Sequence, residues 1–255
     1  MRAGLAADAD SPELDEILSA ISGVDGWLTD DQARLLWDRA RVLPAGARVV
    51  EIGNFRGRST IVLARAAPHA AEIVAIDPHA GSDRGPQEIE AEPKRGAEDH
   101  AVFHANVRAA GVDNHVRHVR KLSQDAGDDV HGNLDLLYID GTHRYAPALS
   151  DMRQWGSRVV IGGTMFVHDA FCSIGVTRAI ARELLFSHTF SYRGRVGSLA
   201  EYRREPVEGK RRVRNISRQL VEGPWFARGL LVKLLITLKL RPLTRLLGNR
   251  LPWPY

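Results

Sequence analysis

Strand-like and helix-like patterns alternate along the middle of the chain, and this alternation limits the possible folds more than any other feature. Short aliphatic and β-branched runs, typical of buried strands, lie at residues 48–52, 72–76, 115–119, 134–139 and 159–167. Helical patterns lie between or after them at residues 59–66, 97–110, 145–155 and 175–185. Repeated strand–helix–strand units predict a Rossmann-like α/β fold, with a central, mostly parallel sheet, helices on both faces and ligands at the carboxyl ends of the strands.

The segments around this core carry weaker signals. Two helices are expected before it, at residues 12–21 and 30–42, and Ser11 and Thr29 are candidate N-caps. Residues 78–98 are polar and rich in Gly and Pro, which is typical of a mobile lid or of a disordered loop. A closing hairpin is expected from the strand-like runs at 189–192 and 198–202.

Charge is unevenly distributed along the 255 residues, whose formal net charge is +4. From Arg203 to Tyr255 there are 13 Lys and Arg against 3 Asp and Glu, whereas residues 1–202 hold 22 against 28. An acidic domain with a basic tail is unlike a nucleic-acid-binding core, so no nucleic-acid partner is expected. The chain is therefore divided into a helical lead-in, an α/β domain and a basic amphipathic tail, at residues 1–46, 47–204 and 205–255.

Two further features favour a cytoplasmic protein. The first residues, MRAGLAADADSPELDE, lack the apolar segment of a secretory signal. Cys172 is the single cysteine and has no partner for an internal disulfide, which agrees with a reducing compartment.

The stretch VVEIGNFRGRST, at residues 49–60, predicts a strand followed by a ligand-binding turn. A dinucleotide site would require bare backbone against a pyrophosphate, but Phe55 and Arg56 stand between Gly53 and Gly57. A nucleoside without phosphates, such as S-adenosylmethionine, suits this loop better. Asp77 follows the next strand and could accept hydrogen bonds from the ribose hydroxyls.

The alternative is that Gly53 and Gly57 only form a tight turn between a strand and a helix. The acidic residue at the end of the next strand favours the nucleoside. Glu51 would then support the loop and, through water, the ammonium group of the ligand.

The segment EIGNFRGRS resembles the first motif of the class I methyltransferases, in particular the branch shared by the catechol-type and the macrocin and cephalosporin-cluster O-methyltransferases. KLSQDA, at residues 121–126, is similar to their adenine-side segment, and the resemblance spans residues 47–180. It implies S-adenosylmethionine as cofactor. The candidate cofactor-binding residues are Glu51, Gly53, Asn54, Phe55, Gly57, Ser59, Asp77, Pro78, Ser123, Gln124 and Asp140.

Two stretches carry candidate catalytic groups, LDLLYIDGTHRY at 134–145 and GGTMFVHDAF at 162–171. Asp140 ends one strand and Asp169 follows the other, so their carboxylates should meet at the cofactor edge. Carboxylate oxygens suit Mg²⁺, which could polarise an acceptor hydroxyl, and His143 is the candidate general base. The alternative is that each aspartate caps the helix that follows it.

The resemblance supports His143 as the base, but the chain departs from the metal-ligand pattern of these families. The base of the macrocin-like enzymes resembles His143 in position, and the catechol-type enzymes have a lysine there. Their later pair of ligands is acidic–acidic or Asp–Asn, whereas this chain has His168 and Asp169. His168 could ligate a softer ion such as Mn²⁺, giving the metal set Asp140, His168 and Asp169, or it could hydrogen-bond the loop.

The tail contains the most apolar stretch, FARGLLVKLLITLKL at 226–240. A helix of roughly 15 residues reaches only about 22 Å, short of the roughly 30 Å hydrocarbon layer, so it should not span a membrane. The surrounding Lys and Arg favour a peripheral anchor on anionic lipid at the inner face of the plasma membrane. The alternative is packing on the core or on a second copy in a homodimer.

These features predict a metal-assisted, S-adenosylmethionine-dependent O-methyltransferase. The macrocin-like resemblance suggests a sugar hydroxyl as acceptor, and the tail suggests a glycolipid. The alternatives are methylation of a small phenol or polyketide, or a membrane-tethered binding module without catalysis, which His168 in place of an acid keeps open. A nicotinamide oxidoreductase is disfavoured by Phe55 and Arg56.

Overall fold

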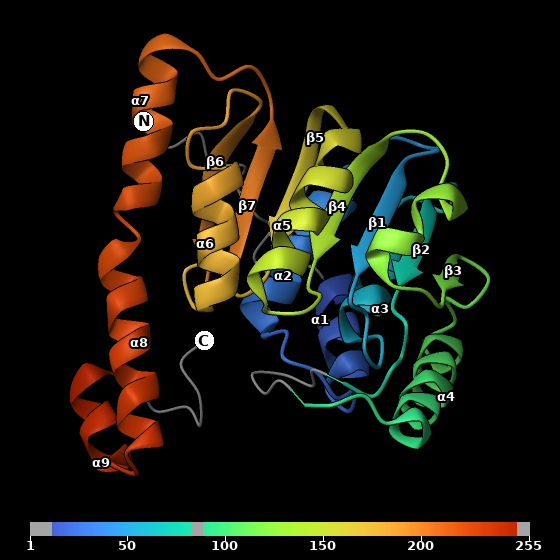
Figure 1. Cartoon of the computed structure of the whole chain (residues 1–255). Coiled ribbons are helices and arrows are strands. Elements are labelled where there is room, and N and C mark those ends of the chain that lie inside the picture. Colours follow the sequence, from blue (N-terminus) through green and yellow to red (C-terminus); the bar gives the residue numbers. More distant parts are fainter. Residues whose placement is uncertain (1–11, 83–88, 249–255) are drawn as a thin grey trace.

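The computed structural model describes residues 12–82 and 89–248 of the chain. Its centre is a seven-stranded sheet in the order β3-β2-β1-β4-β5-β7-β6 (Figure 1). The strands are β1 (Arg48–Ile52), β2 (Glu72–Ile76), β3 (Val116–Val119), β4 (Leu134–Ile139), β5 (Val159–Val167), β6 (Phe190–Val196) and β7 (Leu199–Arg204). The first five strands pair in parallel, whereas β7 pairs antiparallel with both β5 and β6. The predicted Rossmann-like, mostly parallel sheet is confirmed.

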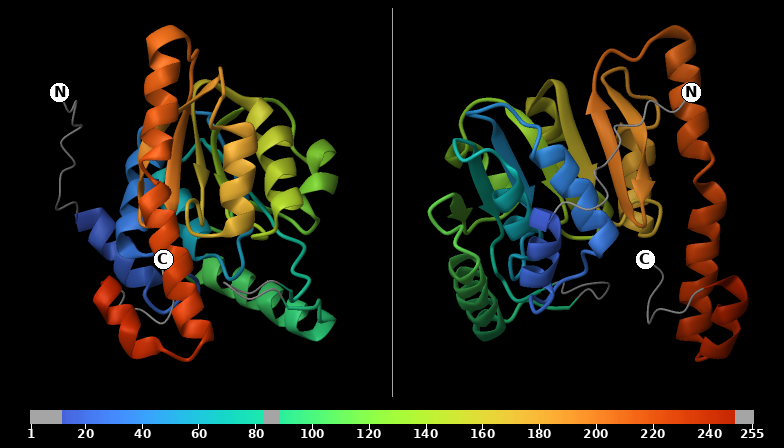
Figure 2. Two further views of the ribbon diagram at one scale, coloured as in Figure 1. Left: turned by 60° about the vertical axis from the view of Figure 1, so that its left-hand side comes forward. Right: turned by 180° about the vertical axis from the view of Figure 1, so that it is seen from behind.

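Helices cover both faces of this sheet (Figure 2). They are α1 (Pro12–Ile21), α2 (Asp30–Ala40), α3 (Arg58–Ala66), α4 (Pro93–Ala109), α5 (Tyr145–Gln154), α6 (Ile174–Glu183), α7 (Gly209–Leu220), α8 (Gly223–Thr237) and α9 (Arg241–Thr244). Successive strand residues point to opposite faces, so Val49 packs with α1, α2 and α3, while Val50 packs with α5 and α6. Both faces of the central strands are therefore buried, as their continuous apolar runs predict.

Local signals explain several element boundaries. Thr29 caps α2 in a capping box with Gln32, as its position predicts, while the other candidate cap, Ser11, lies outside the described residues. The hairpin forms as β6 and β7, longer than its sequence pattern suggests. Within the predicted loop 78–98, the last residues belong to α4, because Glu92 caps its N-terminus and Pro93 occupies the first turn. Residues 83–88 of that loop lie outside the described residues.

The first part of the tail forms helix α7, which packs on the core. The sequence patterns did not reveal this helix. Helix α7 buries a polar face: Asn215 Oδ1 accepts a hydrogen bond from the backbone N–H of Tyr192 at 2.7 Å. Glu222 accepts hydrogen bonds from the Tyr192 hydroxyl and the Arg195 guanidinium, at 2.8 and 2.7 Å. At α8, Lys233 donates to the carbonyl of Cys172. Arg218 and Arg228 likewise donate to the carbonyls of Tyr192 and Leu247, so several tail cations bind to protein carbonyls. The division at residue 205 stays a prediction.

The second part of the tail leaves leucines exposed. Helices α7 and α8 form a column beside β6, and the end of α8 and α9 lie at the same end of the molecule as the carboxyl ends of the parallel strands (Figures 1 and 2). The exposed leucine face consists of Leu231, Leu234, Leu238, Leu240, Leu243 and Leu246, which are 44–83% exposed. Within residues 12–82 and 89–248, no helix combines the length and apolarity needed to cross a bilayer.

Candidate functional site

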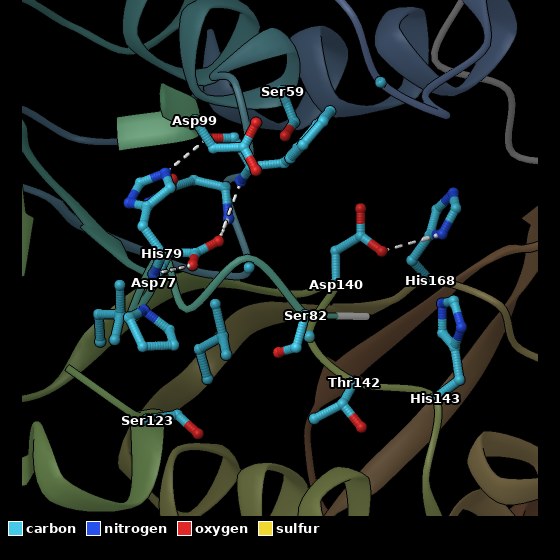
Figure 3. Close-up of a pocket in the computed structure, with 18 of the residues that line it drawn as sticks. Ser59, Asp77, His79, Ser82, Asp99, Ser123, Asp140, Thr142, His143 and His168 are labelled. Carbon is cyan, nitrogen blue, oxygen red and sulfur yellow. Dashed lines mark hydrogen bonds and ion pairs between the residues drawn. The ribbon is translucent and has the colours of Figure 1, made fainter. Parts of the chain in front are cut away.

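A cavity opens at the carboxyl ends of β1, β2 and β4, where a parallel sheet of this topology binds its ligand (Figure 3). Its walls come from the loops after these strands, from the loop before α2 and from α5. The predicted residues that line it are Gly53, Asn54, Phe55, Ser59, Asp77, Pro78, Ser123, Asp140, His143, His168 and Asp169. Three predicted cofactor-binding residues, Glu51, Gly57 and Gln124, are not among those lining it.

The loop after β1 depends on its two glycines. Gly53 has φ +83°, and a Cβ atom there would come within 2.1 Å of the carbonyl oxygen of Asp140. Any side chain at this position would therefore push β1 and β4 apart at the cavity floor. Gly57 has φ +91° and forms the N-cap of α3, against Phe103. These glycines explain why the loop passes so close to the end of β4.

Asp77 holds this loop against the end of β2. Its Oδ2 accepts hydrogen bonds from the backbone N–H groups of Asn54 and Phe55, at 3.1 and 3.0 Å. Its Oδ1 accepts one from the backbone N–H of His79 at 2.7 Å. Each carboxylate oxygen can accept more than one hydrogen bond, so capacity remains for ligand hydroxyls on the cavity side.

Glu51 has a role behind the cavity. It is fully buried and accepts hydrogen bonds from the hydroxyls of Ser59 and Thr60, in the first turn of α3. Burial raises the pKa of Glu51 to about 8, although both hydroxyls act in the opposite direction. The carboxyl group therefore fixes α3 to β1, and its predicted contact with a ligand ammonium group stays a prediction.

At the other end of the cavity, Ser123 donates a hydrogen bond to Asp151 Oδ1 at 2.5 Å. The Ser123 carbonyl accepts one from the indole N–H of Trp155, which fixes this segment against α5. Burial raises the pKa of Asp151 to about 6, although Ser123 acts in the opposite direction. Asp151 was missed in the sequence because nothing distinguishes one helix aspartate from another before the helix is packed.

The loop before α2 forms one rim of the cavity. Trp27 lines the cavity and lies 5.3 Å from the ring of Phe55, centroid to centroid. Asp25 accepts a hydrogen bond from Arg56 at 2.6 Å, which ties this rim to the loop after β1. From the sequence, residues 1–46 are predicted only as a helical lead-in. The signal that this prediction passed over is an aromatic residue inside the polar stretch VDGWLTD.

Four predicted catalytic or metal-binding residues meet at the ends of β4 and β5. His143 Nε2 lies 2.5 Å from Asp169 Oδ2. His168 Nδ1 lies 3.1 Å from Asp140 Oδ1 (Figure 3). It also lies 3.3 Å from Asp169 Oδ2. Neither aspartate caps a helix, because Arg144 and Ser173 occupy the N-cap positions of α5 and α6. The capping alternative is therefore wrong.

Charge pairing within this cluster shifts its pKa values. Burial lowers the pKa of His168, but the charges of Asp140 and Asp169 outweigh it and raise that pKa well above the usual range. Burial likewise lowers the pKa of His143, yet the hydrogen bond and charge of Asp169 leave it raised. For Asp169, the two histidines outweigh burial and hold the pKa well below its usual value. Asp169 is thus an anion between two imidazoles.

The same cluster can accommodate a divalent cation. Ligand atoms of Asp140, His143 and Asp169 all lie within 4.8 Å of one another, and carboxylate oxygens suit Mg²⁺ or Mn²⁺. His168 instead directs Nδ1 at both carboxylates, a hydrogen-bonding geometry that leaves its part in metal binding a prediction.

The family comparison decides the class of this site. The protein-family model for a methyltransferase domain matches residues 50–170, which contain the glycine loop, Asp77, Asp140, His143 and Asp169. Residues 50–170 are a methyltransferase domain. The resemblance drawn from EIGNFRGRS is thereby confirmed.

Solved structures similar to the chain share the fold of this methyltransferase domain. The O-methyltransferase TomG from Streptomyces achromogenes, in complex with SAM, is 19% identical, with 76% of this chain and 90% of TomG covered and a TM-score of 0.54. The SAH-bound methyltransferase PaMTH1 from Podospora anserina is 14% identical, with coverage of 77% and 89% and a TM-score of 0.57. An O-methyltransferase from Bacillus cereus, in complex with SAH, is 17% identical, with coverage of 78% and 94% and a TM-score of 0.50. At these identities the similarity shows the fold.

Proposed function

We propose that this protein is an S-adenosylmethionine-dependent O-methyltransferase whose general base is His143. The observation that carries the proposal is the paired His143 and Asp169 at the edge of the cavity that also holds the glycine loop and Asp77. The SAM and SAH complexes of TomG and the Bacillus cereus enzyme support the choice of cofactor. A hydroxyl acceptor is favoured because such a group needs a base near neutral pH.

The chain's own residues account for the proton transfer. Asp169 accepts a hydrogen bond from Nε2 of His143, which leaves Nδ1 available to take the proton of the acceptor hydroxyl. The raised pKa of His143 makes it a stronger base than a free histidine once it is neutral. His168, between Asp140 and Asp169, balances their charge in a largely buried cluster. Attack on the sulfonium methyl then requires mainly alignment.

We further propose a divalent cation held by the carboxylates of Asp140 and Asp169, beside His143 as the base. When bound, the cation would act as a Lewis acid that polarises the acceptor hydroxyl. Rate measurements with EDTA, followed by addition of Mg²⁺ or Mn²⁺, test this part separately from the role of His143.

Cofactor binding is tested at Asp77. Replacing Asp77 by alanine is expected to weaken S-adenosylhomocysteine binding by about 1–3 kcal/mol, through loss of charged hydrogen bonds to the ribose. Calorimetry measures the affinity. Because Asp77 also holds the loop through three backbone N–H groups, Asp77→Asn is the companion variant that keeps one oxygen acceptor. Asp113→Ala removes an exposed carboxylate and should bind normally. Tight NAD binding without a response to S-adenosylhomocysteine would exclude the proposed cofactor.

The acceptor is proposed to be a sugar hydroxyl carried on a lipid. The end of α8 and α9 lie at the end of the molecule toward which the carboxyl ends of the parallel strands point (Figure 1). Most of the exposed leucine face belongs to these helices and the residues next to them, together with Lys239, Arg241 and Arg245. A peripheral contact with anionic lipid at this end would bring the cavity near a headgroup. Small phenols and polyketides are the alternative acceptors, and a panel of soluble hydroxyl compounds assayed by S-adenosylhomocysteine release separates the two.

Vesicle binding tests the lipid contact. The protein is expected to pellet with anionic vesicles, and binding should weaken as salt rises because screening shortens the reach of the Lys and Arg charges. Replacing Leu234 and Leu238 by serine should weaken it as well. Ile161, which is 78% exposed on β5, supplies the matched control Ile161→Ser, with no expected effect. Equal binding to neutral and anionic vesicles, or none to either, would argue that this face covers a second copy of the chain.

A further inference from the structure

A cluster of histidines unused by the proposed reaction lies where α4 meets β3. His100 and His104 are on α4, His118 is on β3, and their candidate ligand atoms all lie within 4.8 Å of one another. The two helix residues are four positions apart and share one face, with their Nε2 atoms 3.2 Å apart. None of the three is among the residues lining the cavity, so the cluster is separate from the methyltransferase site.

Packing alone does not explain these three imidazoles. Phe103 packs on His118, with ring centroids 4.9 Å apart, which accounts for an aromatic ring at that position. However, His118 Nε2 is buried and has no hydrogen-bond partner in the described structure. Such an unpaired buried nitrogen is destabilising, and an apolar side chain would avoid that penalty. The nitrogen therefore requires a partner that the protein itself does not supply.

His118 offers one ring nitrogen to the cluster, within 4.8 Å of a ring nitrogen of His100 and of His104. The imidazole also hydrogen-bonds to the backbone of Asp77, and because Nε2 has no partner, this bond falls to Nδ1. Metal-bound histidines commonly use their second nitrogen in this way, which fixes the tautomer and turns the ligand nitrogen to the ion.

We propose that His100, His104 and His118 form a binding site for Zn²⁺ or a similar transition-metal ion, with the remaining position open to water. Zn–N bonds of about 2.0–2.1 Å place tetrahedral ligand atoms roughly 3.4 Å apart, close to the 3.2 Å between His100 and His104. Three imidazoles without a carboxylate favour Zn²⁺, Co²⁺, Ni²⁺ or Cu²⁺ over Mg²⁺. Arg108 and Arg120 add positive charge nearby, which further disfavours ions held by charge alone.

A cation at this site would link α4 to β3 at the edge of the sheet, close to the loop after β1. His79 connects the histidine cluster to this loop. Its ring is 4.9 Å from that of His118, and its Nε2 donates to the Phe55 carbonyl at 2.7 Å. The N-terminal part of α4 also touches this region, since a Cβ atom on Gly96 would come within 2.0 Å of the His79 carbonyl oxygen. The ion would thus stabilise α4 and the loop without taking part in methyl transfer.

Calorimetry with Zn²⁺ on the untagged full-length chain, in excess Mg²⁺, tests this site. One Zn²⁺ per chain is expected, with affinity at least about tenfold lower in His100→Ala and in His104→Ala. Both side chains are partly exposed on a helix, and alanine favours helix, so these variants should fold. His188→Ala removes an exposed histidine elsewhere, and Asp169→Asn alters the carboxylate site, so both should bind Zn²⁺ as the wild type does.

A second measurement separates the site from general affinity for metal. Zn²⁺ should raise the melting temperature of the wild type but not of the His100→Ala/His104→Ala double variant, because only a ligand of the folded state stabilises it. Co²⁺ should give visible absorption in the wild type that the double variant lacks. Equal Zn²⁺ affinity in the wild type and the double variant, or no binding by the wild type, would overturn the proposal. Loss of binding only in Asp169→Asn would assign the ion to the carboxylate cluster.

Discussion

Replacing His143 by alanine is expected to lower the rate of methyl transfer about 10²- to 10⁴-fold, the usual contribution of a positioned general base. Binding of S-adenosylhomocysteine should be nearly unchanged, because the glycine loop, Asp77 and Ser123 come from other segments of the chain. The rate is measured as release of S-adenosylhomocysteine with an acceptor from the hydroxyl panel. The affinity is measured by calorimetry on the same preparations.

The pH profile adds a readout that a purely structural loss would not reproduce. His143 must be neutral to take a proton, so the wild-type rate should rise with pH as the imidazole deprotonates. Because Asp169 leaves the pKa of His143 raised against the effect of burial, this rise should occur above the pH expected for an ordinary histidine. His143→Ala should lack the rise, whereas His131→Ala, an exposed histidine, should retain both rate and profile. A fully active His143→Ala protein would show that the base is wrongly assigned.

Replacing Asp140 by alanine is expected to reduce the rate further than the roughly 10²- to 10⁴-fold of losing the base. Asp140 shares His168 with Asp169, through distances of 3.1 and 3.3 Å from His168 Nδ1. Without Asp140, the buried imidazolium has Asp169 as its remaining anion and competes with His143 for it. Alignment of the acceptor would be lost together with any bound cation. The measurement is the single-turnover rate at saturating cofactor.

Tyr138→Phe is the matched control for this change. It removes the hydroxyl that donates to Asp140 Oδ2 at 2.8 Å but keeps the carboxylate, so its effect should be small by comparison. Loss of activity in both Asp140→Ala and EDTA-treated wild type would support the metal. Full activity in EDTA with an inactive Asp140→Ala would instead assign Asp140 the role of pairing with His168. Full activity of Asp140→Ala would contradict the proposed site altogether.

Elements with a repeated local pattern were predictable from the sequence. The strands at 48–52, 72–76, 134–139 and 159–167 have the bounds that their aliphatic runs predict, because a strand buried on both faces needs an unbroken apolar run. The start of α2 at its N-cap Thr29 was predictable because a cap depends only on neighbouring residues. Helix α7 was missed because it buries the polar residues Asn215 and Gln219 against the core, whereas its apolar Val213 and Leu220 are exposed.

Some residues of the candidate site were likewise predictable from the sequence, and others were not. Gly53, Asp77, Asp140 and Asp169 could be placed together because parallel strands end at one edge of the sheet, so position along the chain determines position at the site. An aromatic residue in a polar stretch distinguishes Trp27 in the sequence, but its place beside Phe55 at the cavity rim depends on how the first two helices fold back over the sheet. The position of Glu51 behind the cavity depends on which side of β1 faces α3.

The sequence by itself determined the α/β architecture, the edge of the sheet that carries the site and the methyltransferase class, because these follow from strand periodicity, glycine positions and short motifs. Only the tertiary structure decided which groups touch. It brought His143 to Asp169, turned His168 toward two carboxylates, and gathered His100, His104 and His118 from a helix and a strand. Such contacts depend on side-chain direction and helix packing, which vary over distances of a few ångströms and leave no periodic trace in the chain.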